Sequence, residues 1–142
     1  MTLFWTLSRE WMISLPSRMV AAIATGGLTV LTFPPFSILL FVPVAYATLF
    51  ALLRHLPVAR AALVGWAFGL GQFGFGLSWI AESFYVDAER FGAIAIPAVA
   101  GLSAGLAIFP AAAAALFTGV ARRHAIEGVM ACLLFATCWT AA

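Results

Sequence analysis

The chain alternates between long uncharged stretches and short segments that hold its charged residues. The three longest stretches, 19–53, 61–81 and 91–121, reach or exceed the roughly 20 residues that a helix needs to cross a membrane. The first of them is interrupted by Phe33-Pro34-Pro35-Phe36, because proline disfavours helix at its own position and at the residue before it. The pattern predicts helical spans at about 19–33, 37–53, 61–81 and 97–119, and an incomplete span at 126–142.

Composition supports this interpretation. Hydrophobic residues make up 65% of the 142 positions and charged residues only 8%. Soluble domains carry about 25% charged residues, so this chain has too few to cover a surface that faces water. We therefore expect an all-α fold: a polytopic membrane helix bundle of about four complete spans and the start of a fifth.

The first 18 residues differ from the rest. Apolar side chains recur there at nearly helical spacing around Arg9 and Glu10, which is typical of an amphipathic segment at the membrane interface. A signal peptide with Arg9 and Arg18 in its basic region is the alternative, but apolar sequence continues well beyond any small-residue cleavage site. We expect 1–18 to be an interfacial or cytoplasmic segment and 19–142 to be the transmembrane helical domain.

The arginines predict the orientation of these spans. With a cytoplasmic N-terminus, only Arg90 lies outside, and six arginines lie inside, as the positive-inside rule expects. These six are Arg9, Arg18, Arg54, Arg60, Arg122 and Arg123. The acidic segment 82–90 is then an outer loop on the far side of the membrane, where Trp79, Glu82 and Tyr85 are candidate loop or interface residues.

Glycines are spaced regularly along the third and fourth predicted spans. The stretch 69–74 matches the dinucleotide-binding pattern G-x-G-x-x-G, but that pattern has meaning only between a strand and a helix, and here it lies inside an apolar span. Small residues four apart instead favour close helix packing in a membrane. The candidate helix-packing residues are Gly65, Gly69, Gly71, Gly74, Gly101 and Gly105.

Other side chains give little indication of chemistry. Glu82, Asp87 and Glu89 could serve as paired carboxylates in acid–base catalysis, but solvated loop charges are the more common explanation. His55 and His124 each lie among arginines without a second ligand at a suitable spacing, so we expect no metal site and no cofactor. Seven scattered arginines form no basic stripe, which disfavours a nucleic-acid partner.

The last part of the chain holds both cysteines. Cys132 and Cys138 are six residues apart, which places them on different faces of a helix, so we expect small buried hydrophobes rather than a disulfide or a chelating pair. No charge or polar tail closes the apolar run that ends at Ala142. A terminal carboxylate in hydrocarbon is costly, and we therefore expect the chain to be a fragment of a longer protein.

The order of these features resembles a known family. The proline break between two short spans is followed by Gly-Trp-Ala-Phe-Gly-Leu-Gly-Gln-Phe-Gly-Phe-Gly-Leu-Ser-Trp-Ile at 65–80, a short outer segment, and Ile-Phe-Pro-Ala at 108–111. This arrangement resembles the N-terminal transmembrane region of apolipoprotein N-acyltransferase. The resemblance covers roughly 19–142, and the segment 65–80 is its most specific part.

The resemblance implies an enzyme of the bacterial inner membrane. Members of the family transfer an acyl chain from a membrane phospholipid to the N-terminal S-diacylglyceryl-cysteine of an apolipoprotein. The chemistry belongs to a nitrilase-like domain with a Glu-Lys-Cys triad, in which a base-activated thiolate forms a thioester that the amine then attacks. This chain has no lysine and its cysteines lie in a predicted span, so we expect no catalytic residue in it and no activity from it alone.

The sequence also allows a second class of function. A small transporter or permease subunit, or a structural membrane protein without enzymatic activity, could also use glycine-rich spans. Transporters usually place charged or polar groups near mid-membrane to handle substrate. The four complete predicted spans contain no charged residue, and Gln72 is the only amide in the chain, which favours the acyltransferase interpretation.

Overall fold

The structure is a computed structural model that describes residues 14–34, 36–86 and 88–141. All regular elements in these ranges are helical, which confirms the all-α prediction for this part of the chain. Most of the predicted interfacial segment 1–18 lies outside the described residues. The elements are α2 (Leu15–Leu28), the 3-10 helix η1 (Thr29–Thr32), α3 (Phe41–Leu53), α4 (Val58–Gly76), α5 (Ile80–Tyr85), α6 (Ala88–Leu106), α7 (Ile108–Arg123) and α8 (Gly128–Thr140).

The first predicted span begins earlier than expected. Helix α2 starts at Leu15 rather than at residue 19, with Pro16 in its first turn. Proline is well tolerated there, because the first N–H groups of a helix have no intrahelical partner. The helical segment then ends with η1, and Phe33 adopts an extended conformation, as expected before Pro34.

The next two spans also differ from their predicted limits. Helix α3 begins at Phe41, four residues later than predicted, because turns occupy the residues after Phe36. The third predicted span, 61–81, is divided into α4 and α5 by a short turn at 77–79.

The predicted outer loop at 82–90 is wrong in its secondary structure. Glu82 lies in the first turn of α5, and α6 already begins at Ala88. An acidic side chain is favourable in the first turn of a helix, because it faces the positive end of the helix dipole. Charge in this segment therefore indicates contact with water and does not by itself indicate a loop.

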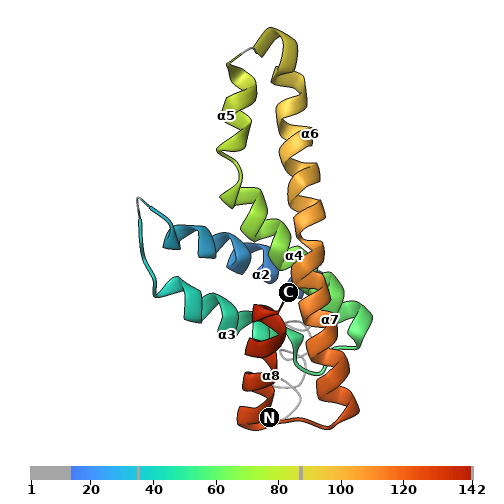
Figure 1. Cartoon of the computed structure of the whole chain (residues 1–142). Helices are drawn as coiled ribbons and strands as arrows, with labels where there is room; N and C mark the ends of the chain where they lie inside the picture. The colour runs from blue at the N-terminus through green and yellow to red at the C-terminus, as the bar shows by residue number, and fades with distance from the viewer. Residues whose placement is uncertain (1–13, 35, 87, 142) are drawn as a thin grey trace, which may run out of the picture.

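The fourth predicted span, 97–119, contains two helices that follow one another. Figure 1 shows α6 and α7 as a long, nearly continuous rod with a break between them. The break falls at Ala107, three residues before Pro110, which lacks the N–H that would bond to the carbonyl of Leu106. Helical hydrogen bonds continue around it, from Ala107 N to Ser103 O (2.9 Å) and from Ala111 N to Ala107 O (3.1 Å).

Among the described residues, two segments are long and apolar enough to cross a membrane, Leu15–Thr32 and Gly92–Arg123. Phe41–Leu53 and Gly128–Thr140 are shorter apolar helices. Four complete spans and the start of a fifth therefore remain a proposal, because length and composition support only two.

Helix α4 occupies the centre of the fold. It packs against α2 on one face and against α7 on another, while α5 packs against α6, and α8 against α7 (Figure 1). The turn between α5 and α6 lies at the opposite end of the molecule from the turn between α7 and α8 (Figure 1). This arrangement gives the protein two distinct ends.

Six aromatic side chains from four helices form one cluster in the core. Each ring has a neighbour whose centroid lies 5.4–5.7 Å away, mostly in tilted or edge-to-face geometry, which favours aromatic pairs. The cluster joins α3, α4, α7 and α8 and consists of Tyr46, Phe50, Phe68, Phe117, Phe135 and Trp139.

Candidate functional site

The contact between α2 and α4 depends on glycines from both helices. A Cβ atom added at Gly71 would overlap the carbonyl oxygen of Ile23, and one added at Gly26 would overlap the carbonyl oxygen of Phe68. Both obstacles are backbone atoms, which cannot move aside as a side chain can. Gly71 was predicted as a packing residue from the sequence, whereas Gly26, its counterpart on α2, was missed.

The opposite face of α4 approaches α7 through two further glycines. A Cβ at Gly65 would lie 2.5 Å from the carbonyl oxygen of Pro110 and 2.7 Å from the Cβ of Ala114. At Gly69 it would lie 2.8 Å from the Cα of Ala107. These separations are too short for a real side-chain atom, so glycine allows the two backbones to approach this closely.

Three other predicted packing residues have different surroundings. Within the part of the chain that the structure describes, a Cβ at Gly74, Gly101 or Gly105 would meet no atom within 4 Å. Gly101 and Gly105 lie on the exposed surface of α6. Gly74 borders a groove between α4 and α6 of about 380 Å³, which is lined by Leu70, Gly74, Ser78, Ala81, Ile96, Val99, Ala100 and Ser103.

The three predicted interface residues are all exposed around α5. Trp79 is the N-cap residue of this helix, Glu82 lies in its first turn, and Tyr85 is its last residue. They recur every three residues, so they follow one side of the segment. Asp87, one of the two acids predicted to accompany Glu82, lies outside the described residues.

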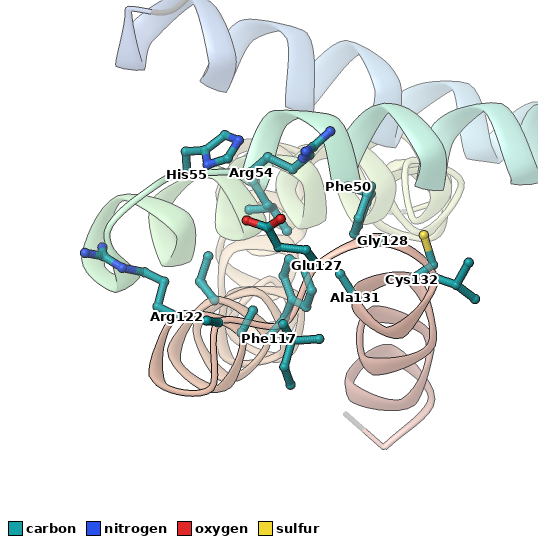
Figure 2. Close-up of a pocket in the computed structure, with 15 residues that line it drawn as sticks. Phe50, Arg54, His55, Phe117, Arg122, Glu127, Gly128, Ala131 and Cys132 are labelled. Carbon is teal, nitrogen blue, oxygen red and sulfur yellow. The ribbon is translucent and has the colours of Figure 1, made fainter.

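A second cavity lies at the other end of the molecule, where α3 and α7 end and α8 begins. This cleft has a volume of about 560 Å³. Figure 2 shows Phe50, Phe117 and Ala131 along its wall, and Arg54, His55, Arg122 and Glu127 around its rim. Sequence reasoning missed the cleft, because it depends on three helix ends that are far apart in the chain.

Two turns at the cleft have left-handed backbone conformations. His55, with φ of 63°, follows the end of α3, and Ala125, with φ of 49°, follows the end of α7. In the second turn the N–H of Ile126 donates to the carbonyl of Ala121 at 2.9 Å, as in a Schellman motif, where glycine is usual. Both turns direct the chain around the rim of the cleft.

Two arginines bind carbonyl groups near the end of α3. A guanidinium N–H of Arg18 donates to the carbonyl oxygen of Leu52, and Arg122 makes a longer hydrogen bond of 3.5 Å to the carbonyl oxygen of Leu56. Carbonyls in the last turn of a helix lack intrahelical partners, and cations near them are favourable. The ends of α2, α3 and α7 that carry arginines therefore lie at the same end of the fold.

The two cysteines are free thiols on α8. Cys132 is exposed and lines the cleft, in contrast to the prediction of a buried hydrophobe, while Cys138 is half-buried against the aromatic cluster. Figure 2 places the sulfur of Cys132 at the α8 side of the cleft, away from the side chain of His55. This arrangement does not resemble a cysteine–base pair for nucleophilic catalysis.

These features define a class of protein: a helical, strongly apolar domain of the kind that associates with membranes, organised around a glycine-rich central helix. Sequence comparison identifies it further. The sequence model described as "Apolipoprotein N-acyltransferase N-terminal domain" matches residues 25–142. The chain belongs to this family, as the resemblance at 65–80 and 108–111 indicated.

Three relatives illustrate the match, and each is named apolipoprotein N-acyltransferase. The protein of Photobacterium profundum is 34% identical over 117 residues, and that of Caulobacter vibrioides is 39% identical over 117 residues, each alignment covering 80% of this chain. The protein of Nitrosomonas europaea is 43% identical over 100 residues, or 66% of this chain. The aligned region makes up only 19% to 22% of the relatives.

Proposed function

We propose that this chain is the membrane-embedded part of an apolipoprotein N-acyltransferase. The complete enzyme would transfer an acyl chain from a phospholipid to the N-terminal S-diacylglyceryl-cysteine of a lipoprotein. The main support is the family match over 25–142, which includes the glycine-rich helix α4 at the centre of the fold. Membrane phospholipid and diacylglyceryl apolipoprotein are then the donor and the acceptor.

The role of these residues would be structural rather than catalytic. A thioester mechanism needs an activated thiolate beside a base and a group that stabilises the oxyanion. The chain has no lysine, and its two cysteines lie on α8 without such an arrangement. We propose that the helices, held together by Gly65, Gly69 and Gly71, anchor the catalytic domain and keep it close to the membrane that supplies the donor.

Reconstitution tests this division of labour. The purified 142-residue chain and a full-length form, each in phospholipid vesicles, would be incubated with a diacylglyceryl-cysteine peptide. We expect amide-linked acyl peptide, detected by mass spectrometry, from the full-length form only. If the short chain alone gave product and retained this activity after replacement of both cysteines, the proposed location of the chemistry would be wrong.

We also propose a bacterial inner-membrane location with the N-terminus in the cytoplasm. Arg54, Arg122 and Arg123 cluster at the end of the fold formed by the α3–α4 and α7–α8 turns, opposite the α5–α6 turn. Positive charge on short loops favours the cytoplasmic side. The α5–α6 end would then face the periplasm, where the acceptor would be modified.

Cysteine labelling in intact cells tests this orientation. Single cysteines at Ser83 and Ala59, in a variant without Cys132 and Cys138, would be exposed to a thiol reagent that does not cross the membrane. We expect labelling at position 83 and protection at position 59, because they lie at opposite ends of the fold. Permeabilised cells, in which both sites should react, provide the control; preferential labelling at 59 in intact cells would reverse the orientation.

A further inference from the structure

The cleft formed by α3, α7 and α8 is divided into an apolar part and a charged part. Phe50 and Phe117, both members of the aromatic cluster, form its apolar wall together with Ala131. Arg54, His55, Arg122 and Glu127 lie around its rim (Figure 2). A cavity of about 560 Å³ falls within the usual range for small-molecule sites, which is roughly 300–1,000 Å³. An amphipathic ligand would suit this division.

The charge around the cleft favours an anion. Arg54 and Arg122 line it, and Arg123 follows directly on α7, whereas Glu127 is the single acidic residue among its lining side chains. Arginine binds phosphate oxygens with several N–H donors in a fixed planar geometry. Basic pockets between membrane helices are known to bind the headgroups of anionic lipids.

We infer that this cleft binds one anionic phospholipid, at the opposite end of the molecule from the α5–α6 turn. Its phosphate would lie at the rim, bound by Arg54 and, once its side chain turns from the carbonyl of Leu56, by Arg122. The upper part of an acyl chain would lie against Phe50 and Phe117. The inference rests on the cleft and its charges and does not depend on acyl transfer. It describes a lipid that holds three helix ends together, separate from the donor lipid.

A further membrane helix is the competing occupant, and the rim argues against it. An apolar helix placed over the cleft would bury the guanidinium groups of Arg54 and Arg122 with only Glu127 to balance their two charges, which is unfavourable. A lipid phosphate would supply both the negative charge and the hydrogen-bond acceptors. Glu127 should weaken the binding of this lipid, because its carboxylate repels an anionic headgroup.

Lipid binding to the purified full-length protein tests the inference. Native mass spectrometry in detergent would follow titration with phosphatidylglycerol, and with zwitterionic phosphatidylcholine of the same chain length. We expect one tightly bound phosphatidylglycerol, and a loss of affinity of about fivefold in Arg54→Gln and in Arg122→Gln, since each basic residue near a lipid surface contributes about 1 kcal/mol. Glu127→Gln should raise the affinity.

Arg123→Gln is the matched control, because Arg123 is exposed at the same end of α7 but does not line the cleft. It should leave the affinity nearly unchanged. An equal loss in Arg122→Gln and Arg123→Gln would overturn the inference, because general surface charge would then explain the binding. Equal binding of the two lipids would overturn it as well. Unchanged melting temperatures would show that all four variants remain folded.

Cys132 provides an independent readout, because it is exposed and lines the cleft. Its alkylation by N-ethylmaleimide would be followed by peptide mass spectrometry with and without each lipid. We expect phosphatidylglycerol to slow the reaction at Cys132 in the unmodified protein and to slow it less in Arg122→Gln. A rate that phosphatidylglycerol does not change would show that the bound lipid lies elsewhere and would overturn the assignment to this cleft.

Discussion

Two parts of helix α4 have the same kind of sequence but different surroundings. At Gly71 the backbone of α2 lies so close that any side chain would overlap the carbonyl of Ile23. At Gly74, three residues further along the same helix, a Cβ would meet no described atom within 4 Å. Neighbouring positions on a helix point in different directions, so each glycine meets a different part of the fold. Gly71 lies where α2 and α4 approach most closely, whereas Gly74 is turned toward the groove between α4 and α6.

The comparison shows what small-residue spacing can and cannot predict. Glycines four residues apart make close approach possible, but the crossing point decides which of them is used. Gly65 and Gly69 lie against α7, whereas Gly101 and Gly105 on α6 have the same spacing and an exposed surface. The pattern therefore identifies candidate faces rather than contacts.

The largest expected effect comes from placing a leucine at the crossing point. Gly71→Leu should destabilise the protein by more than about 4 kcal/mol or prevent folding, because α2 and α4 must separate to admit the side chain. Gly74→Leu is the matched variant on the same helix and should cost less than about 1 kcal/mol, because its surroundings are open. Unfolding in detergent, followed by circular dichroism, measures both.

The result for Gly74 also tests the comparison itself. If Gly74→Leu destabilised the full-length protein as strongly as Gly71→Leu, another segment would have to pack into the groove beside Gly74. The contrast between the two glycines would then hold only within these 142 residues.

A second effect distinguishes the aromatic core from the outer surface. Phe68 is 0% exposed and contacts Tyr46 and Trp139, whereas Phe75, two turns further along α4, is 61% exposed. Phe68→Ala should cost about 3 kcal/mol, through lost contacts and the cavity that remains. Phe75→Ala should change stability by no more than about 0.5 kcal/mol. Thermal unfolding in one detergent compares them, and equal losses would contradict the assignment of the core to this region.

The helical class of the fold could be predicted from the sequence because it depends on local pattern. Long uncharged stretches and the proline break in the sequence predicted the approximate positions of α2, α3 and α7. Their limits were less predictable: the first helix begins at Leu15, with Pro16 in its first turn, rather than at residue 19, and Glu82 lies in a helix instead of a loop. In each case a polar or proline residue was compatible with the first turn of a helix.

The candidate sites were harder to predict, because they depend on contacts between distant parts of the chain. Gly71 could be proposed from spacing, but its counterpart Gly26 needed the crossing of α2 and α4. In the sequence, Phe50 and Phe135 are indistinguishable from other apolar residues. Only the fold shows that their ring centroids lie 5.5 Å apart. A pair of glycines in the first span, Gly26-Gly27, was the one signal in the sequence that could have indicated the α2 face.

The smallest expected change in stability distinguishes two tryptophans, one that is hydrogen-bonded between helices and one that is exposed. The indole Nε1 of Trp66 on α4 donates to the carbonyl oxygen of Ala104 at 3.1 Å. Ala104 lies in the last turn of α6, where carbonyls lose intrahelical partners, so this bond joins two helices and satisfies an end group. Trp66→Phe keeps an aromatic ring but removes the donor, and should cost about 1 kcal/mol.

Trp79→Phe is the matched variant, because Trp79 is 65% exposed beside α5. Its replacement should leave stability nearly unchanged, since water or lipid headgroups can replace any contact that the indole makes. Chemical unfolding of both variants in the same detergent measures the difference. Equal stability of Trp66→Phe and the unmodified protein would mean that the carbonyl of Ala104 finds another donor, and that α4 and α6 are held together at this level by packing alone.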